Sequence, residues 1–134
     1  MRFAGYAAVF DRTDRGGDVV RAGAFARAVK QGGAGVPLLW QHDPARPIGR
    51  IEYLREDKRG LRVIARLGGG AAAREAAAQL ETGRVRGLSF GYRVRAAHGE
   101  APRELDDLDL VEVSLVTHPM QPRARVHAVE AVSR

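Results

Sequence analysis

The sequence of 134 residues contains no cysteine. The protein therefore has no disulfide framework, no thiolate metal site and no thiol nucleophile, so its chemistry must use hydroxyl, imidazole or carboxylate groups. Long apolar runs are also missing: no window approaches the roughly 18 apolar residues of a membrane span, and no basic stretch with a long apolar run opens the chain. We therefore expect a soluble, intracellular protein without membrane contact. A chain of this length predicts a single domain over residues 1–134.

Lysine is the second scarce residue, because 20 of the 22 basic residues are arginine. The net charge of +6 and the pI near 10.7 make nucleic acid a partner to consider. The arginines are scattered, however. They alternate with apolar residues, as at Arg62 and Arg66, and form no run of five or more. No base-stacking or groove-reading motif accompanies them, so specific nucleic-acid binding is not the expected function.

Turn residues and hydrophobic periodicity divide the chain into many short strands and a few helices. Strand-like segments lie at residues 2–10, 18–20, 36–41, 48–54, 61–67, 85–95 and 109–117, and helical segments at 23–31 and 71–82. Pro44 and Pro47 predict a turn, and residues 96–104 a polar loop. The end of the chain, from about 125 to 134, predicts either a last strand or a frayed tail. Strands without regular βαβ alternation favour an antiparallel sheet closed into a barrel or sandwich.

The segment Gly87-Leu88-Ser89-Phe90-Gly91-Tyr92 places a serine between two glycines. A period of two puts Leu88 and Phe90 on an apolar core face and Ser89 on the opposite face. The glycines leave the hydroxyl unscreened and let a peptide backbone approach, as a nucleophile requires. Taken by itself, such a segment is more often a bend in a barrel with an incidental serine.

His42 follows Leu38 and Trp40 at period two, so we expect it at the end of an apolar strand and on their face. An imidazole beside apolar cover with access to a loop keeps the neutral form that a general base needs. The alternative is a surface histidine at the Asp43-Pro44 turn, and Gln41 and Asp43 are lesser candidates.

Glu112 shares a strand face with Ser114 between apolar residues, where a carboxylate is costly without a partner. His42 is such a partner: a carboxylate that accepts Nδ1–H fixes the tautomer and stabilises the imidazolium formed when Ser89 loses its proton. An outward-facing glutamate on a solvated strand is the alternative, and His118, which follows the same strand, is a second candidate for the orienting group.

Three aspartates, Asp11, Asp14 and Asp18, lie near one another in the sequence. Their spacing across two glycines lacks the Asp-rich loop with a terminal glutamate that binds calcium. We therefore interpret them as turn residues and expect neither a metal nor a cofactor.

The order and spacing of several segments resemble the prohead maturation proteases of tailed bacteriophages, which are similar in turn to the herpesvirus assemblins. The segments are residues 5–10, 17–20, 23–25, 37–43, 47–49, 60–61, 87–92 and 110–117. The resemblance covers most of the chain. It implies a mainly β fold with helices (α+β), namely an assemblin-like closed antiparallel β-barrel edged by two or more short helices.

Carried onto this sequence, the resemblance makes Ser89 the nucleophile and His42 the base of a serine endopeptidase. The phage pattern points to Glu112 as third member, whereas assemblins use a second histidine, for which His118 stands here. Assemblins form their oxyanion hole near two adjacent arginines; here Arg123 and Arg125 are separated by one residue, and a backbone N–H near Ser89 is the alternative.

The same resemblance implies a place and a substrate. The enzyme is expected within the assembling prohead, in the cytoplasm of the bacterial host, where it cuts the major capsid protein or its scaffold segment. The resemblance does not decide whether the enzyme also cuts itself or forms a homodimer. Two other functions compete: a catalytically inactive, scaffold-binding relative, and a basic nucleic-acid-binding barrel.

Overall fold

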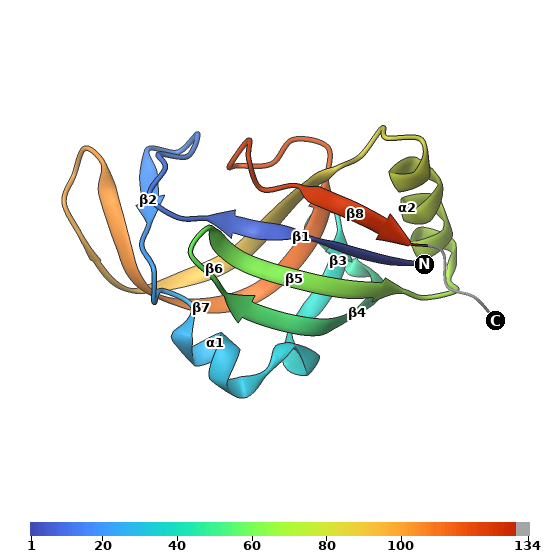
Figure 1. Ribbon diagram of the computed structural model, residues 1–134, viewed down its shortest axis with the longest axis horizontal. Coiled ribbons are helices and arrows are strands. Elements are labelled where there is room, and N and C mark those ends of the chain that lie inside the picture. Colours follow the sequence, from blue (N-terminus) through green and yellow to red (C-terminus); the bar gives the residue numbers. More distant parts are fainter. Residues whose placement is uncertain (131–134) are drawn as a thin grey trace.

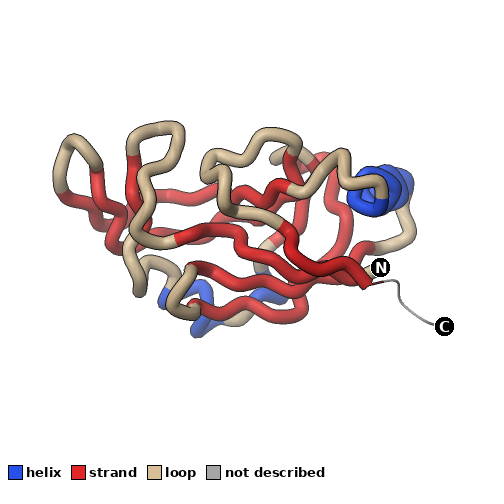
Figure 2. The backbone as a smooth tube through the Cα atoms, turned by 45° about the horizontal axis from the view of Figure 1, so that its top comes forward, coloured by secondary structure: helices blue, strands red, loops and turns tan. Residues whose placement is uncertain are grey.

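The computed structural model describes residues 1–130. Eight strands and two α-helices follow one another in the order β1 (Arg2–Val9), β2 (Asp18–Val20), α1 (Ala26–Gln31), β3 (Pro37–Trp40), β4 (Asp43–Glu56), β5 (Gly60–Leu67), α2 (Ala71–Glu81), β6 (Gly87–His98), β7 (Arg103–Val116) and β8 (Val126–Glu130), with a 3-10 turn, η1 (Gly33–Gly35), after α1. Strands form most of the backbone, and the helices lie at two separate places on its periphery (Figure 2). Of the end segment, residues 126–130 form a strand, and 131–134 lie outside the described residues.

One sheet joins all eight strands in the order β2-β7-β3-β4-β5-β1-β8, with β6 paired to β7 (Figure 1). The expectation of an antiparallel sheet is wrong in part, because β7 runs parallel to both β2 and β3. A closed barrel is not confirmed either. Within residues 1–130, β6 and the start of β8 are joined by an isolated bridge, Gly87 to Arg125, rather than by a continuous ladder.

The alternation of buried and partly exposed residues that forms one side of the core is clearest on β5. In β5, Leu61, Val63, Ala65 and Leu67 are buried, whereas the arginines between them are partly exposed. Phe25, just before α1, fills the centre of the core and makes an edge contact with Phe90, the two ring centroids lying 5.2 Å apart. Burial of such apolar surface is the main stabilising contribution of the fold.

Two prolines lie inside a strand rather than in the predicted turn. Pro44 and Pro47 belong to β4, where residues 43–47 pair with β3 alone, because pairing of β4 with β5 begins at Gly49. Proline is tolerated in a strand segment of this kind, which has a partner strand on one side only. The register with β3 is correspondingly irregular, shifting on both sides of Leu39.

The predicted polar loop at 96–104 is largely strand. β6 continues to His98 and β7 begins at Arg103, so both strands of this hairpin reach beyond the core. The imidazole of His98 contacts Asp106 through Nδ1 at 2.5 Å and Glu104 through Nε2 at 2.8 Å, which supplies polar pairing in place of apolar packing. Neither helix in residues 1–130 has the length and apolar character needed to cross a membrane.

Candidate active site

His42 lies in a two-residue turn between β3 and β4 and not at the end of a strand. Trp40 pairs with Asp43, and the two residues between them have positive φ angles, 53° at Gln41 and 62° at His42. Hairpin turns with two positive φ angles usually contain asparagine and glycine, because other side chains are strained in the left-handed region. The expectation that His42 continues the face of Trp40 is therefore wrong, and the imidazole is aimed by the turn.

Hydrogen bonds from β7 hold this turn. The Gln41 N–H donates to the Leu115 carbonyl at 2.9 Å, and its side-chain amide bonds Thr117 twice, donating to Oγ1 at 2.7 Å and accepting from the backbone N–H at 3.1 Å. The His42 N–H donates to the Ser114 hydroxyl at 3.2 Å. Local strain of this kind persists where surrounding contacts impose it, which is common at functional sites.

Glu112 meets His42 directly. Its Oε2 lies 2.6 Å from Nδ1 of His42, while Oε1 accepts a hydrogen bond from the Ser114 hydroxyl at 2.8 Å. The glutamate side chain is 11% exposed and the histidine side chain 44% exposed. The buried carboxylate is thus satisfied on both oxygens, and the imidazole keeps its other edge toward solvent.

The hydrogen bond with Glu112 raises the pKa of His42 above its ordinary value, against partial burial, which lowers it. In the neutral imidazole, a proton on Nδ1 donates to the carboxylate and leaves the lone pair of Nε2 free. The arrangement therefore fixes one tautomer and favours the protonated ring, both of which suit a group that accepts and returns a proton.

Ser89 lies on β6, directly opposite Ser114 of β7. Leu88 and Phe90 point into the core as predicted, and directly opposed residues carry their Cβ atoms about 5 Å apart on the same face. The Ser89 hydroxyl therefore lies beside the Ser114 hydroxyl, which accepts the hydrogen bond from the backbone N–H of His42. Within residues 1–130, no hydrogen bond joins Ser89 to His42; such bonds are often formed only when substrate is bound.

The glycines around Ser89 have a different role from the predicted one. A Cβ at Gly87 would lie 2.8 Å from Pro119 Cδ, and a Cβ at Gly91 would lie 2.8 Å from Oε2 of Glu112. Both glycines make room for neighbouring groups of the protein, and Ser89 is only 6% exposed. Within residues 1–130, every fully enclosed polar side-chain atom has a hydrogen-bond partner. The Ser89 hydroxyl has no such partner in these residues, so this hydroxyl is not fully enclosed and retains contact with solvent.

The remaining predicted residues lie around this group. His118 is exposed beyond the end of β7 and forms no hydrogen bond with His42 within the described residues. The bridge between Gly87 and Arg125 is flanked by backbone hydrogen bonds from Leu88 to Ala124 and from Val126 to Arg86, both 2.9 Å. This register puts Arg125 on the face of Ser89 and brings Arg123 toward its level.

Sequence reasoning missed the supporting residues Ser114, Thr117 and Gly91 and ranked Gln41 low. Ser114 had a signal, since it shares a strand face with Glu112. The local sequence pattern did not reveal the role of Thr117, or that the Glu112 side chain packs against Gly91, because both contacts involve residues distant in the sequence.

The predicted aspartates act within the fold. The Asp14 carboxylate accepts N–H groups of Gly16 and Asp18, at 2.8 and 2.9 Å, as a turn residue does. Asp18 binds Arg103 through two hydrogen bonds, at 3.0 and 2.8 Å. Within residues 1–130, no three acidic or histidine side chains gather as metal ligands.

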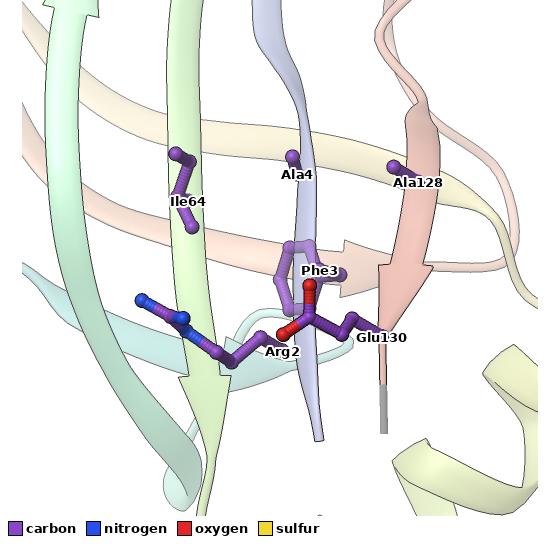
Figure 3. A pocket seen from close by; sticks show the side chains of 6 residues that line it. All are labelled: Arg2, Phe3, Ala4, Ile64, Ala128 and Glu130. Atoms are coloured by element: carbon purple, nitrogen blue, oxygen red, sulfur yellow. The ribbon is translucent and has the colours of Figure 1, made fainter. Parts of the chain in front are cut away.

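Several hollows lie on the surface of the described residues, and two of them involve β1 and its neighbouring strands. One, of about 200 Å³, lies over β5, β1 and β8, and its lining includes Ala4, Ile64 and Ala128 (Figure 3). The other, of about 360 Å³, is lined by Tyr6, Arg59, Arg123, Arg125 and His127, among other residues. The second hollow includes residues beside β6, whereas the first contains none of the candidate residues.

Comparisons with known proteins connect this geometry to a family. Residues 1–133 match the family model described as "Caudovirus prohead serine protease". The chain is 31% identical over 138 residues to the prohead protease of Enterobacteria phage HK97, covering 97% of this chain and 60% of that protein. It is also 28% identical over 109 residues to the capsid polyprotein of Pseudomonas phage PAJU2, covering 74% of this chain and 16% of that protein. The chain thus spans less than two thirds of the length of either relative.

Solved structures share the fold at low identity. The capsid assembly protease of bacteriophage T4 superposes with a TM-score of 0.67 at 16% identity, covering 85% of this chain and 79% of that one. The KSHV protease superposes with a TM-score of 0.62 at 12% identity, covering 93% of this chain and 63% of that one. The varicella-zoster virus protease superposes with a TM-score of 0.57 at 15% identity, covering 93% of this chain and 62% of that one. An assemblin-like α+β arrangement is therefore the fold of this chain.

Proposed function

We propose that this chain, which belongs to the caudovirus prohead serine protease family, is a serine endopeptidase of phage capsid maturation with Ser89 as nucleophile, His42 as base and Glu112 as the group that orients the base. The observation that carries the proposal is the 2.6 Å contact between His42 and Glu112 beside the strand that holds Ser89. An imidazole fixed by a buried carboxylate next to a serine hydroxyl is the arrangement that acyl transfer requires.

In the proposed reaction, Nε2 of His42 takes the proton of the Ser89 hydroxyl while Oγ attacks the carbonyl carbon of the substrate. The imidazolium is stabilised by Glu112 and then gives its proton to the leaving amine, so the peptide bond breaks and an acyl-enzyme remains. Water, deprotonated by His42, attacks the ester and releases the acid. All three groups come from one chain, and the proposed chemistry needs no metal or cofactor.

The charge that develops on the carbonyl oxygen needs hydrogen-bond donors. Arg125 shares the face of Ser89 and Arg123 approaches its level, so both are proposed to face the oxyanion, with a backbone N–H near Ser89 as the alternative donor. His118 is proposed to have no orienting role, because Glu112 already occupies the Nδ1 side of His42.

The proposed substrate is the major capsid protein or its scaffold segment, cut within the assembling prohead in the host cytoplasm, and the chain itself is a further candidate substrate. This proposal extends the family membership by what the names of the HK97 and PAJU2 relatives say of those proteins. A homodimer is a further proposal, and the proposed site does not require one.

The function is tested on the intact chain in two ways. A fluorophosphonate probe should label the wild-type chain at Ser89, with loss of fluoride, and should label neither Ser89→Ala nor urea-unfolded protein. Co-expression with the cognate capsid protein should yield a shortened capsid chain by mass spectrometry, and Ser89→Ala or His42→Ala should slow its formation by about 10³-fold or more.

Two further variants separate the candidates for the third member. Glu112→Gln should lose most activity and His118→Ala little, since only Glu112 contacts the imidazole within the described residues. Processing by Ser89→Ala would exclude the proposed nucleophile. An unlabelled, non-cleaving chain that still binds scaffold would identify the inactive structural relative instead.

A further inference from the structure

Arginines form a row across the outer face of the sheet next to the candidate site. The register places them in neighbouring strands: Arg125 lies level with Gly87 of β6 and with Tyr6 of β1, Tyr6 pairs with Arg62 of β5, and Arg62 pairs with Arg55 of β4. Directly paired residues share a face. The row therefore starts one strand from Ser89 and continues away from it.

Most of this positive charge is not neutralised internally. No carboxylate of residues 1–130 forms an ion pair with the row and its neighbours, namely Arg55, Arg59, Arg62, Arg123 and Arg125. Eight arginines elsewhere in the described residues do form ion pairs, as Arg103 does with Asp18 and Arg27 with Asp107. An unpaired group of arginines over one face concentrates positive potential there.

The acids nearest to the row are committed to local bonds. Asp57 accepts the Tyr6 hydroxyl at 2.6 Å and the Arg59 N–H at 2.8 Å. Glu56 accepts the backbone N–H groups of Gly23 and Phe25, at 2.7 and 2.9 Å. These carboxylates fix the β4–β5 turn and leave the guanidinium groups available to another partner.

Three of these arginines line the hollow of about 360 Å³ described above, which is called the arginine groove below. Its lining includes Arg59, Arg123 and Arg125 together with the aromatic side chains of Tyr6 and His127, whose ring centroids are 5.9 Å apart. The Arg59 guanidinium lies 5.0 Å from the centre of the Tyr6 ring, which holds it over the groove. Guanidinium groups bind carboxylates through paired N–H donors, so the groove matches an acidic side chain.

We infer that the part of this arginine groove formed by Arg59 and Tyr6, beyond the proposed oxyanion donors, is a substrate subsite that binds aspartate or glutamate side chains a few residues from the bond to be cut. Neighbouring strands are about 4.8 Å apart and an extended peptide advances about 3.3 Å per residue, so Tyr6, two strands from β6, lies about three peptide residues from Ser89. The groove is small, and its residue Arg125 is bridged to Gly87 of the strand that carries Ser89, which favours an acidic protein segment over nucleic acid. As a substrate subsite, this inference rests on the proposed function.

Binding by the Ser89→Ala chain tests the groove without requiring catalysis. The probes are a fluorescein-labelled octapeptide with four consecutive glutamates, its twin with four glutamines, and a labelled 20-nucleotide single strand, measured by fluorescence polarisation. The glutamate peptide should bind at least tenfold more tightly than the glutamine peptide in 50 mM salt. Its affinity should fall as salt rises to 300 mM, because exposed charges are screened.

Matched charge variants locate the binding. Arg59→Gln with Arg125→Gln should weaken the glutamate peptide about tenfold. Arg74→Gln with Arg84→Gln removes the same charge from α2 and the loop after it, at the other end of β5 from the β4–β5 turn (Figure 1), and should change binding less than twofold. The single variant Arg123→Gln repeats the comparison with a smaller change in case the double variant is unstable.

Equal affinity for the two peptides, or equal losses in the two double variants, would overturn the inference. Tighter binding of the oligonucleotide, lost with Arg59 and Arg125, would assign the groove to nucleic acid and overturn it as well. Acidic-peptide binding in a chain whose wild type neither labels nor cleaves would refute the proposed function and leave the acidic-peptide site standing.

Discussion

At Gly91, a single added methyl group should displace the carboxyl group of Glu112 and so weaken its contact with His42. A Cβ at this residue would lie 2.8 Å from Oε2 of Glu112 and 3.1 Å from both Cδ and Cγ. Ordinary contacts between such atoms begin at about 3.5 Å, so the carboxyl group must move by more than half an ångström or Gly91 must give way. The carboxylate that contacts His42 at 2.6 Å is the group in its path.

The magnitude follows from that hydrogen bond. A hydrogen bond with a charged partner is worth about 1.5–3 kcal/mol, which corresponds to about ten- to 150-fold in rate if it is lost in the transition state. We expect Gly91→Ala to lower kcat/KM by this factor while the overpacked strand loses about 1–3 kcal/mol of stability. The readouts are cleavage kinetics, urea unfolding and the NMR titration of His42, whose pKa should fall toward its ordinary value.

A double-mutant cycle with Glu112→Ala isolates the cause. Glu112→Ala removes every atom that the new methyl group would meet within the distances given above, so Gly91→Ala should have little further effect on activity in that background. Gly35→Ala is the matched control, since a Cβ there has open space around it. Unchanged activity in Gly91→Ala, or an equal loss with and without the Glu112 side chain, would refute this account of the glycine.

Two pH dependences follow from the charged pairs. Because Glu112 raises the pKa of His42, and only the neutral ring accepts a proton, kcat/KM should rise with pH through an inflection above about 6.5; Glu112→Gln should move the inflection downward, and an unmoved inflection would contradict the pairing. Arg103 lowers the pKa of Asp18, so the pair stabilises the fold above the unfolded pKa of about 3.9 and loses that contribution as pH falls through the lower folded value. Urea midpoints of Arg103→Gln should therefore be below wild type at pH 7, and the difference should shrink as the pH falls below about 3.9; a constant difference would mean that Arg103 acts through packing.

The strands that carry the site could be predicted where a single face is buried. On β6 and β7, strand parity gave the core side chains Leu88, Phe90, Val113 and Leu115 correctly. It did not predict that Ser89 and Glu112 on the other face are buried as well, or that Val111 is exposed. The same logic predicted β5 and the β4–β5 turn, where Asp57 accepts two backbone N–H groups. In these segments the local pattern and the tertiary environment require the same conformation.

The turn at His42 could not be predicted from its residues. Two successive positive φ angles are uncommon without glycine. The bonds that impose them on Gln41 and His42 come from Ser114, Leu115 and Thr117, more than 70 residues later. The space above Gly91 depends in the same way on Glu112 of the neighbouring strand. Such features are properties of the assembled sheet rather than of any sequence window.

The outer half of the β6–β7 hairpin was mistaken for a loop for a related reason. Both of its faces are exposed from Arg95 to Glu100, so no alternation marks it as strand. Its strand conformation is supported instead by polar pairs such as His98 with Asp106. Hydrophobic periodicity detects strands that pack on a core and misses those that extend beyond it.

The parallel pairing of β3 with β7 has a consequence for protein synthesis. The base is on the chain by residue 42, yet the strand that fixes its turn and supplies Glu112 and Ser114 is the penultimate one. A nascent chain that has not yet extended past β7 therefore has no oriented imidazole, however long it waits on the ribosome. Under the proposed mechanism, catalysis therefore starts only after β7 has been synthesised and has paired with β3.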